Sequence, residues 1–368
     1  MDVAMQGGTM VGMAFVIAAG LVPALKKPAR RLGLVDHPCR RKRHDGQIPL
    51  TGGLAMFLAF MTALLINFSY LGTYASLLGG MCILLIVGML DDLLDIRALY
   101  KLTAQVLVAT IMVLVSGLEV HQLGSIFGAE VGKIGLGPFS IPFTIACVVF
   151  LINAINMSDG LDGLAGGTGM FILLMLALLG WMNGAPTSLV VVCLVLATAV
   201  LGFLMYNLQS PFRQRASAFM GDAGSMMLGF GIAWLTIAMV TAESTSVYPV
   251  SIAWLLLIPA TDTLAVSVRR ISMGKSPMAA DRSHLHHIIQ RCGFSVRNTV
   301  RIIHLAVVFT GSVGVFGWYY KLPEWLLFVA AAGCMVGYML LLANAHRIMR
   351  WRLRLVRRQE GFGVQEKP

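Results

Sequence analysis

The sequence has few charged residues. Only 12% of its 368 residues are Asp, Glu, Lys or Arg, about half the share that an ordinary soluble domain carries. Hydrophobic residues make up 57% of the chain. This balance excludes a typical water-soluble globular domain and predicts a polytopic membrane protein, with no feature that indicates a nucleic-acid partner.

Paired cysteines and a basic leader are also missing. The six cysteines are scattered and none forms a CxxC pair, which argues against a disulfide framework or a zinc site. No positive segment precedes the first apolar run, whereas Lys26 and Lys27 directly follow it. This order predicts a signal anchor with its N-terminus outside.

Apolar windows of about 20 residues predict an all-α protein with about eleven transmembrane helices. The chain, 1–368, is expected to form a single integral membrane domain with a cytoplasmic C-terminus. The predicted helices lie near residues 8–25, 50–69, 74–90, 103–119, 139–157, 164–182, 188–206, 223–240, 249–268, 301–320 and 325–345.

The placement of basic residues supports this orientation. The predicted cytoplasmic segments hold 26 of the 28 Lys and Arg residues, as the positive-inside rule requires. The basic tail, 346–368, is expected to lie at anionic headgroups. On the outside, the glycine-rich loop 120–138 predicts a small hairpin.

Six acidic residues fall at the predicted cytoplasmic ends of the spans. A transporter tends to keep its charged groups near the middle of the bilayer, so this one-sided placement favours chemistry at the inner surface. A solute transporter is the alternative from another functional class. The six residues are Asp91, Asp92, Asp95, Asp159, Asp162 and Asp222.

The segment 153–167 combines two Asn, two Asp and four Gly at the end of an apolar run. Polar side chains there are costly unless they face a cavity or a partner, and glycines let the backbone approach a ligand. A simple helix cap and turn is the alternative, but it would need fewer of these residues. The segment is therefore predicted to form a binding site.

Carboxylates in two other segments indicate a divalent cation. Asp91, Asp92 and Asp95 close the third predicted helix, and hard oxygen ligands suit Mg²⁺. Asp222 stands between two glycines at the start of the eighth predicted helix. The alternatives are a solvated helix end for the first group and a helix N-cap for Asp222.

The cytoplasmic loop 269–300 carries the sequence Asp-Arg-Ser-His-Leu-His-His at 281–287. The histidine spacing does not place all three rings on one helix face, which argues against zinc. Together with Arg282, the histidines are better suited to donate hydrogen bonds to a diphosphate. Asp262 is expected to be structural, pairing with Arg269 or Arg270.

Four segments together resemble the polyprenyl-phosphate N-acetylhexosamine-1-phosphate transferases, most closely the WecA-type branch. They are DDLLD (91–95), NAINMSDGLDG (153–163), FMGDAGS (219–225) and DRSHLHHIIQRCGFS (281–295). The resemblance implies a bacterial cytoplasmic-membrane enzyme that moves a sugar-1-phosphate from a UDP-sugar to a polyprenyl phosphate and releases UMP. It also implies Mg²⁺, with Mn²⁺ as a substitute.

The same resemblance assigns roles to individual residues. Asp222 and Asn156 would hold the metal, and Lys101 would meet the lipid phosphate. The catalytic set is Asp91, Asp92, Lys101, Asp159 and Asp222. The substrate-binding set is Asn153, Asp159, Gly160, Asp162 and Phe219 for the nucleotide side, and Arg282, His284, His286 and His287 for the diphosphate.

The donor is expected to be UDP-N-acetylglucosamine and the acceptor undecaprenyl phosphate. The pattern His-Leu-His-His differs from the consecutive triplet of the peptidoglycan branch, which argues against a muramyl-pentapeptide donor. A sister transferase that uses another UDP-N-acetylhexosamine is the alternative. The glycan pathway (lipopolysaccharide O-antigen, for example), a homodimer, and the role of Asp91 and Asp92 as base, nucleophile or positioning groups stay open.

Overall fold

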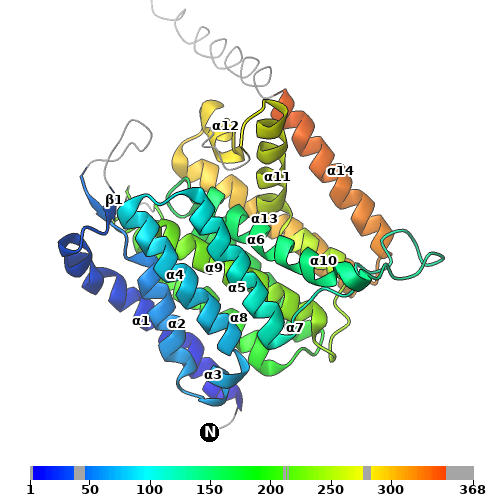
Figure 1. The fold of residues 1–368 in the computed structure, drawn as a ribbon, viewed down its shortest axis with the longest axis horizontal. Helices are drawn as coiled ribbons and strands as arrows, with labels where there is room; N and C mark the ends of the chain where they lie inside the picture. The colour runs from blue at the N-terminus through cyan, green and yellow to red at the C-terminus, as the bar shows by residue number, and fades with distance from the viewer. Residues whose placement is uncertain (1–2, 37–45, 210–212, 214, 277–282, 345–368) are drawn as a thin grey trace, which may run out of the picture.

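The computed structural model describes residues 3–36, 46–209, 213, 215–276 and 283–344. Its helices pack side by side as one bundle (Figure 1). Strands β1 (Val35–Asp36) and β2 (Ile48–Pro49) pair antiparallel. The helices are α1 (Val3–Arg31), α2 (Gly52–Leu64), α3 (Ser69–Thr73), α4 (Ala75–Leu94), α5 (Ala98–Ser116), η1 (Gly137–Phe139), α6 (Ser140–Ser158), α7 (Leu164–Met182), α8 (Thr187–Asn207), α9 (Gly221–Thr241), α10 (Pro249–Leu255), α11 (Leu257–Ser272), α12 (Leu285–Arg291), α13 (Val296–Tyr319) and α14 (Glu324–Ala343).

The all-α polytopic membrane architecture is confirmed. In the described part of the chain, nine helices are long and apolar enough to cross a bilayer. Each of the nine coincides with a predicted span. The total number of crossings stays a prediction, because two of the eleven predicted spans take a different form. The orientation also stays a prediction. The nine helices are α1, α4, α5, α6, α7, α8, α9, α13 and α14.

The predicted span at 50–69 is shorter than expected. Helix α2 has 13 residues, so it is about 20 Å long and falls short of the ~30 Å hydrocarbon core. The Asn67 side chain accepts hydrogen bonds from the backbone N and the hydroxyl of Ser69, at 3.1 and 2.7 Å. Such local bonds compete with helix continuation, and they precede the separate short helix α3.

The predicted span at 249–268 is broken rather than straight. Helices α10 and α11 meet at an angle of 77°. Pro259 lies in the first turn of α11, and its ring would clash with the carbonyl of Leu255 in a continuous helix. The chain therefore bends at Leu256, which lies between the two helices.

Helix α9 forms the centre of the bundle, with α4, α6 and α7 packed against it (Figure 1). Every residue from Ala223 to Met239 is buried, as expected for a helix that is apolar on all sides. Glycines allow its neighbours to come close. A Cβ added to Gly53 of α2 would lie 2.6 Å from the Gly224 nitrogen, and one added to Gly88 of α4 would lie 2.3 Å from the Ala223 Cα.

The predicted hairpin at 120–138 is present. Leu123 N donates to Ile134 O at 2.8 Å, and Leu136 N donates to His121 O at 2.8 Å. These bonds flank an antiparallel bridge between Gln122 and Gly135. The hairpin lies at the opposite end of α5 from Lys101. The predicted basic tail, 346–368, lies outside the described residues.

Candidate active site

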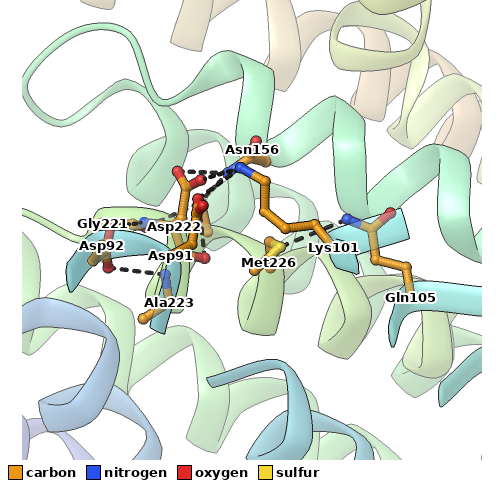
Figure 2. A network of polar contacts seen from close by, with 10 residues as sticks. Asp91, Asp92, Lys101, Gln105, Asn156, Gly221, Asp222, Ala223 and Met226 are labelled. Carbon is orange, nitrogen blue, oxygen red and sulfur yellow. Dashed lines mark hydrogen bonds and ion pairs between the residues drawn. The ribbon is translucent and has the colours of Figure 1, made fainter. Parts of the chain in front are cut away.

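Four helix ends bring five of the predicted site residues together (Figure 2). The last turn of α4 and the last turn of α6 meet the first turns of α5 and α9. Each of these turns contributes at least one polar side chain to the cluster. The residues are Asp91 and Asp92 from α4, Lys101 from α5, Asn156 from α6 and Asp222 from α9.

Lys101 is the cationic centre of this cluster. Its Nζ lies 2.6 Å from Asp91 Oδ2 and 2.9 Å from Asp222 Oδ2. The two carboxylates would repel each other without a cation between them. Asp91 is buried, whereas the Lys101 and Asp222 side chains are 24% and 34% exposed. The ammonium therefore remains reachable for an anion that enters from solvent.

Asn156 and Ser225 hold the other side of Asp222. Asn156 Nδ2 donates to Asp222 Oδ1 at 3.1 Å and to Ser225 Oγ at 2.9 Å. Ser225 is fully buried and donates in turn to Gly221 O at 2.9 Å. Asp222 is thus held between an ammonium and an amide, which fixes its carboxylate at the start of α9.

Asp92 faces a different group from its neighbour Asp91. Asp92 Oδ1 accepts a hydrogen bond from Asp222 N at 2.9 Å, and Asp92 Oδ2 accepts one from Ala223 N at 3.3 Å. Gly221 has φ +71°, and a Cβ there would lie 2.4 Å from Asp92 Oδ2. Asp92 therefore satisfies free N–H groups at the N-terminus of α9.

The oxygen atoms of the cluster suit Mg²⁺. This ion is usually held by one or two carboxylates together with substrate phosphates. Asp222 and Asn156 offer a carboxylate and an amide carbonyl, and Asp91 Oδ1 is buried without a hydrogen-bond partner in the described part of the chain. The described residues contain no group of three or more His, Cys, Asp or Glu that could by itself hold a metal ion.

The turn between α6 and α7 is tied to the segment that follows α8. Asp162 Oδ2 accepts hydrogen bonds from Gln209 Nε2 at 3.0 Å and from Ala216 N at 3.2 Å. Asn207 Oδ1 accepts one from Gly163 N at 2.7 Å. Asp162 therefore supports the wall of the site, and its predicted contact with the nucleotide stays a prediction.

Phe219 lies just before α9 and is held through its backbone. Its N donates to Pro49 O at 3.0 Å, and its O accepts from Gly52 N at 3.0 Å. The side chain is half-buried. The small β1–β2 ribbon, which the sequence did not predict, thus helps to place this residue beside the start of α9.

His286 meets the turn that follows α6. A Cβ added to Gly160 would lie 2.5 Å from His286 Nε2, and the His287 ring centroid lies 4.2 Å from that of His286. Burial, assisted by His287, lowers the pKa of His286 to about 3, so this ring is neutral at physiological pH. The structure therefore brings Gly160, His286 and His287 together, while Arg282 lies outside the described residues.

His284 lies inside the protein rather than at an open surface. Its Nδ1 lies 2.8 Å from Asp262 Oδ2, and its Nε2 lies 3.3 Å from an Arg270 guanidinium nitrogen. Asp262 also accepts hydrogen bonds from Leu285 N and from the Tyr338 hydroxyl of α14. Both ring nitrogens of His284 are engaged. These contacts favour a positioning role for His284, and its predicted donation to a diphosphate stays a prediction.

The interpretation of Asp262 as structural agrees with these contacts, with the His284 ring as a hydrogen-bond partner. The Asn153 amide nitrogen donates to Gln105 Oε1 and to Val149 O, and its predicted role as a substrate ligand stays a prediction. Asp159 caps the end of α6, one turn beyond Asn156. Its predicted substrate contact stays a prediction.

Comparison with known proteins identifies the family. The sequence profile described as glycosyl transferase family 4 matches residues 74–240. An undecaprenyl-phosphate alpha-N-acetylglucosaminyl 1-phosphate transferase of Escherichia coli (strain K12) is 35% identical over 334 residues, 90% of each chain. The chain belongs to glycosyl transferase family 4. Proteins with the same name from Salmonella typhi and Yersinia pestis are 36% and 34% identical, the latter over 95% of this chain and 93% of its own length.

The part of the chain that matches glycosyl transferase family 4 contains the whole Lys101 cluster and the α6–α7 turn. The histidine loop follows that part, but the similarity to the transferases extends over nine-tenths of the chain. Membership of this family agrees with the resemblance carried by the four sequence motifs.

Several polar residues that build the site were not predicted from the sequence. Gln105 lies within an apolar run, four residues after Lys101, and a polar residue there is a detectable signal. Ser225 ends the FMGDAGS segment, and Asn207 lies in the last turn of α8. Tyr338 of α14 gave no signal, because its partner Asp262 is 76 residues away along the chain.

Proposed function

We propose that this chain transfers N-acetylglucosamine-1-phosphate from UDP-N-acetylglucosamine to undecaprenyl phosphate, giving undecaprenyl-diphospho-N-acetylglucosamine and UMP. The observation that carries the proposal is the Lys101 ammonium held between Asp91 and Asp222. This charge cluster lies where membrane helices end, in a chain 35% identical to proteins named as such transferases. A lipid phosphate and a soluble nucleotide can meet there.

Lys101 is the residue that binds the lipid phosphate. A phosphate monoester has a second pKa near ~6, so the nucleophile is mostly dianionic at neutral pH and needs no general base. One of its oxygens attacks the β-phosphorus, which bears the sugar. The bond from this phosphorus to the oxygen bridging to the α-phosphate breaks, and that oxygen leaves with UMP. Positioning and charge neutralisation then account for most of the catalysis.

Asp222 and Asn156 are the residues that would hold Mg²⁺, or Mn²⁺ in its place. When bound, the ion supplies charge neutralisation for the diphosphate and for the departing UMP. Asp92 keeps the start of α9 in place beneath these ligands. Chelation of divalent cations should stop UMP release and added Mg²⁺ should restore it, whereas full activity in excess chelator would contradict this assignment.

The donor nucleotide lies on the other side of the cluster, against the α6–α7 turn and Phe219. Asp159 and Gly160 bring their backbone toward it, and Asp162 keeps the turn in place. We assign His286 and His287, together with Arg282 of the same loop, to binding its diphosphate, and His284 to holding the loop. The histidine loop has about the length needed to enclose one N-acetylhexosamine, and we therefore expect it to exclude a muramyl-pentapeptide donor.

The site faces the cytoplasm of a bacterium, where UDP-sugars are made, and the protein resides in the cytoplasmic membrane. The orientation rests on the distribution of Lys and Arg. The reaction is then the first membrane step of an envelope glycan such as the lipopolysaccharide O-antigen.

A panel of donors tests the substrate assignment. UMP release is measured in detergent with undecaprenyl phosphate, Mg²⁺ and one of three donors: UDP-N-acetylglucosamine, UDP-N-acetylgalactosamine or UDP-N-acetylmuramyl-pentapeptide. The first should be the best donor and the last should give no lipid product. Preferred use of UDP-N-acetylgalactosamine would indicate a sister transferase. Robust use of UDP-N-acetylmuramyl-pentapeptide would overturn the assignment.

A further inference from the structure

A second set of side-chain contacts lies one helical turn away from the Lys101 cluster. Figure 2 shows one of them, between Gln105 and Met226. Residues three or four apart share one face of a helix, so α5, α6 and α9 each contribute one residue to the cluster and one residue to the second set. We call this second set the second layer. Its members are Gln105, four residues after Lys101, Asn153, three residues before Asn156, and Met226, four residues after Asp222.

The second layer is a continuous chain of contacts. Asn153 Nδ2 donates to Gln105 Oε1 at 2.6 Å, and Gln105 Nε2 lies 3.6 Å from Met226 Sδ. Gln105 is only 2% exposed. A buried amide is costly unless it is hydrogen-bonded, so the Gln105–Asn153 bond fixes both side chains in one arrangement.

Helix α5 is packed on one side and exposed on the other. It packs against α4 and α6, and its other face is exposed, with Leu107 and Leu114 at 54% and 74% exposure. Its polar contacts with α9 are the Lys101–Asp222 ion pair and the Gln105–Met226 contact. Because Lys101 and Gln105 share one face, a rotation of α5 moves both side chains together.

We propose that the second layer sets the register of α5 against α6 and α9 and thereby places the Lys101 ammonium, which makes Gln105 a positioning residue for phosphosugar transfer. The inference rests on the proposed function. A purely structural amide pair could lie anywhere along these helices. The second layer, which is this pair together with Met226, lies on the adjacent turn of all three helices that carry Lys101, Asn156 and Asp222. A change in the second layer would therefore shift these three residues relative to one another.

The variant Gln105→Leu tests this role, because leucine fills a similar volume and cannot hydrogen-bond to Asn153. A displacement of about 1 Å at a reacting group can cost on the order of a hundredfold in rate. We expect kcat to fall by roughly 10- to 100-fold and KM for undecaprenyl phosphate to rise. KM for UDP-N-acetylglucosamine should not change, because the donor is held by the α6–α7 turn and the histidine loop.

Two further variants examine the pair itself. Asn153→Leu should lower kcat as much as Gln105→Leu does. The double variant should be no slower than either single variant, because both substitutions remove the same hydrogen bond. In the exchange variant, Gln105→Asn with Asn153→Gln, the combined reach of the two amides is kept, and kcat should recover toward that of the unmodified protein. The control is Thr110→Val on the exposed face of α5, where the hydroxyl bonds to Val106 O of its own helix; it should leave both KM values and kcat unchanged.

The outcomes are distinct. Unchanged kinetics for Gln105→Leu, additive losses in the double variant, or equal increases in both KM values would overturn the positioning role. Should Gln105→Leu fail to fold in detergent, the exchange variant decides, and a folded but slow exchange protein contradicts the inference. If the unmodified protein released no UMP, that result would instead contradict the proposed function.

Discussion

Neighbouring carboxylates on α4 have different surroundings. Successive residues of an α-helix point about 100° apart, so Asp91 and Asp92 cannot both face Lys101. Asp91 bonds to the Lys101 ammonium, whereas Asp92 accepts from the backbone N–H groups of Asp222 and Ala223. Among the roles that the sequence left open for this pair, the contacts favour positioning for Asp92.

This difference predicts distinct effects for two similar substitutions. Asp91→Asn should lower kcat by at least about 100-fold with little change in the thermal midpoint, because the charge that holds Lys101 is lost. Asp92→Asn should cost about 1 kcal/mol of stability, as the loss of a helix cap does, with a smaller loss of kcat. UMP release and thermal unfolding in detergent measure the two effects.

The control for this pair is Asp95→Asn, at an exposed residue with φ 49° that ends the same helix. Asn tolerates this conformation, so activity and stability should persist. If Asp92→Asn abolished turnover without loss of stability and a higher pH restored it, Asp92 would be a general base instead.

The buried His286 predicts a pH dependence of stability. Its pKa of about 3 in the folded protein lies below the ~6.5 of an unfolded histidine. Between these pH values the unfolded chain binds a proton that the folded chain excludes. The contribution of neutral His286 to the free energy of unfolding is therefore fully present above about pH 6.5 and decreases as the pH falls. The loss should reach about 2 kcal/mol by pH 5.

Thermal unfolding at pH 7.5 and pH 5 measures this effect. His286→Gln should show a smaller decrease in the midpoint than the unmodified protein, while His121→Gln, at an exposed residue of the hairpin, should behave like the unmodified protein. An identical acid decrease in the His286→Gln protein would refute the buried, neutral assignment.

At the scale of elements, α4 and α9 cross at glycine. Gly88 allows α4 to lie against the backbone of Ala223, one turn before Asp91 and Asp92. Gly88→Ala should push α4 away from the start of α9 and lower kcat by roughly 100-fold, together with the thermal midpoint. UMP release and thermal unfolding are the measurements.

The matched control is Gly79→Ala on the same helix, because nothing lies within 4 Å of a Cβ added at that position. It should keep full activity and gain up to about 1 kcal/mol, because alanine favours helix. If Gly88→Ala were as active as Gly79→Ala, the close crossing would not position the carboxylates.

Most elements could be predicted from the sequence because long apolar runs have few other stable forms in a membrane. The exceptions have local causes that hydropathy does not record: the Asn67 side-chain bonds after α2 and Pro259 at the bend before α11. For the site, the motifs predicted which residues gather around Lys101. They could not give the direction of Asp92 or the partner of His284, because both depend on contacts between segments far apart in the chain.

At the scale of the whole molecule, the one-sided distribution of basic residues predicts the orientation. In a chain whose own cysteines are replaced by alanine, Glu130→Cys in the hairpin should react with a membrane-impermeant thiol reagent in intact cells. Met273→Cys, after α11, should react only once the cells are permeabilised. Both residues are exposed, so access across the membrane decides the labelling. The reverse pattern would invert the orientation and place the site outside.

In the proposed reaction the sugar moves together with its phosphate. The most direct measurement uses UDP-N-acetylglucosamine labelled with ³²P at the β-phosphate, incubated in detergent with the purified protein, undecaprenyl phosphate and Mg²⁺. We expect the label to enter the lipid fraction and UMP to form in equal amount. Release of labelled UDP with an unlabelled glycolipid would contradict the proposed reaction, because that result would mean transfer of the sugar alone.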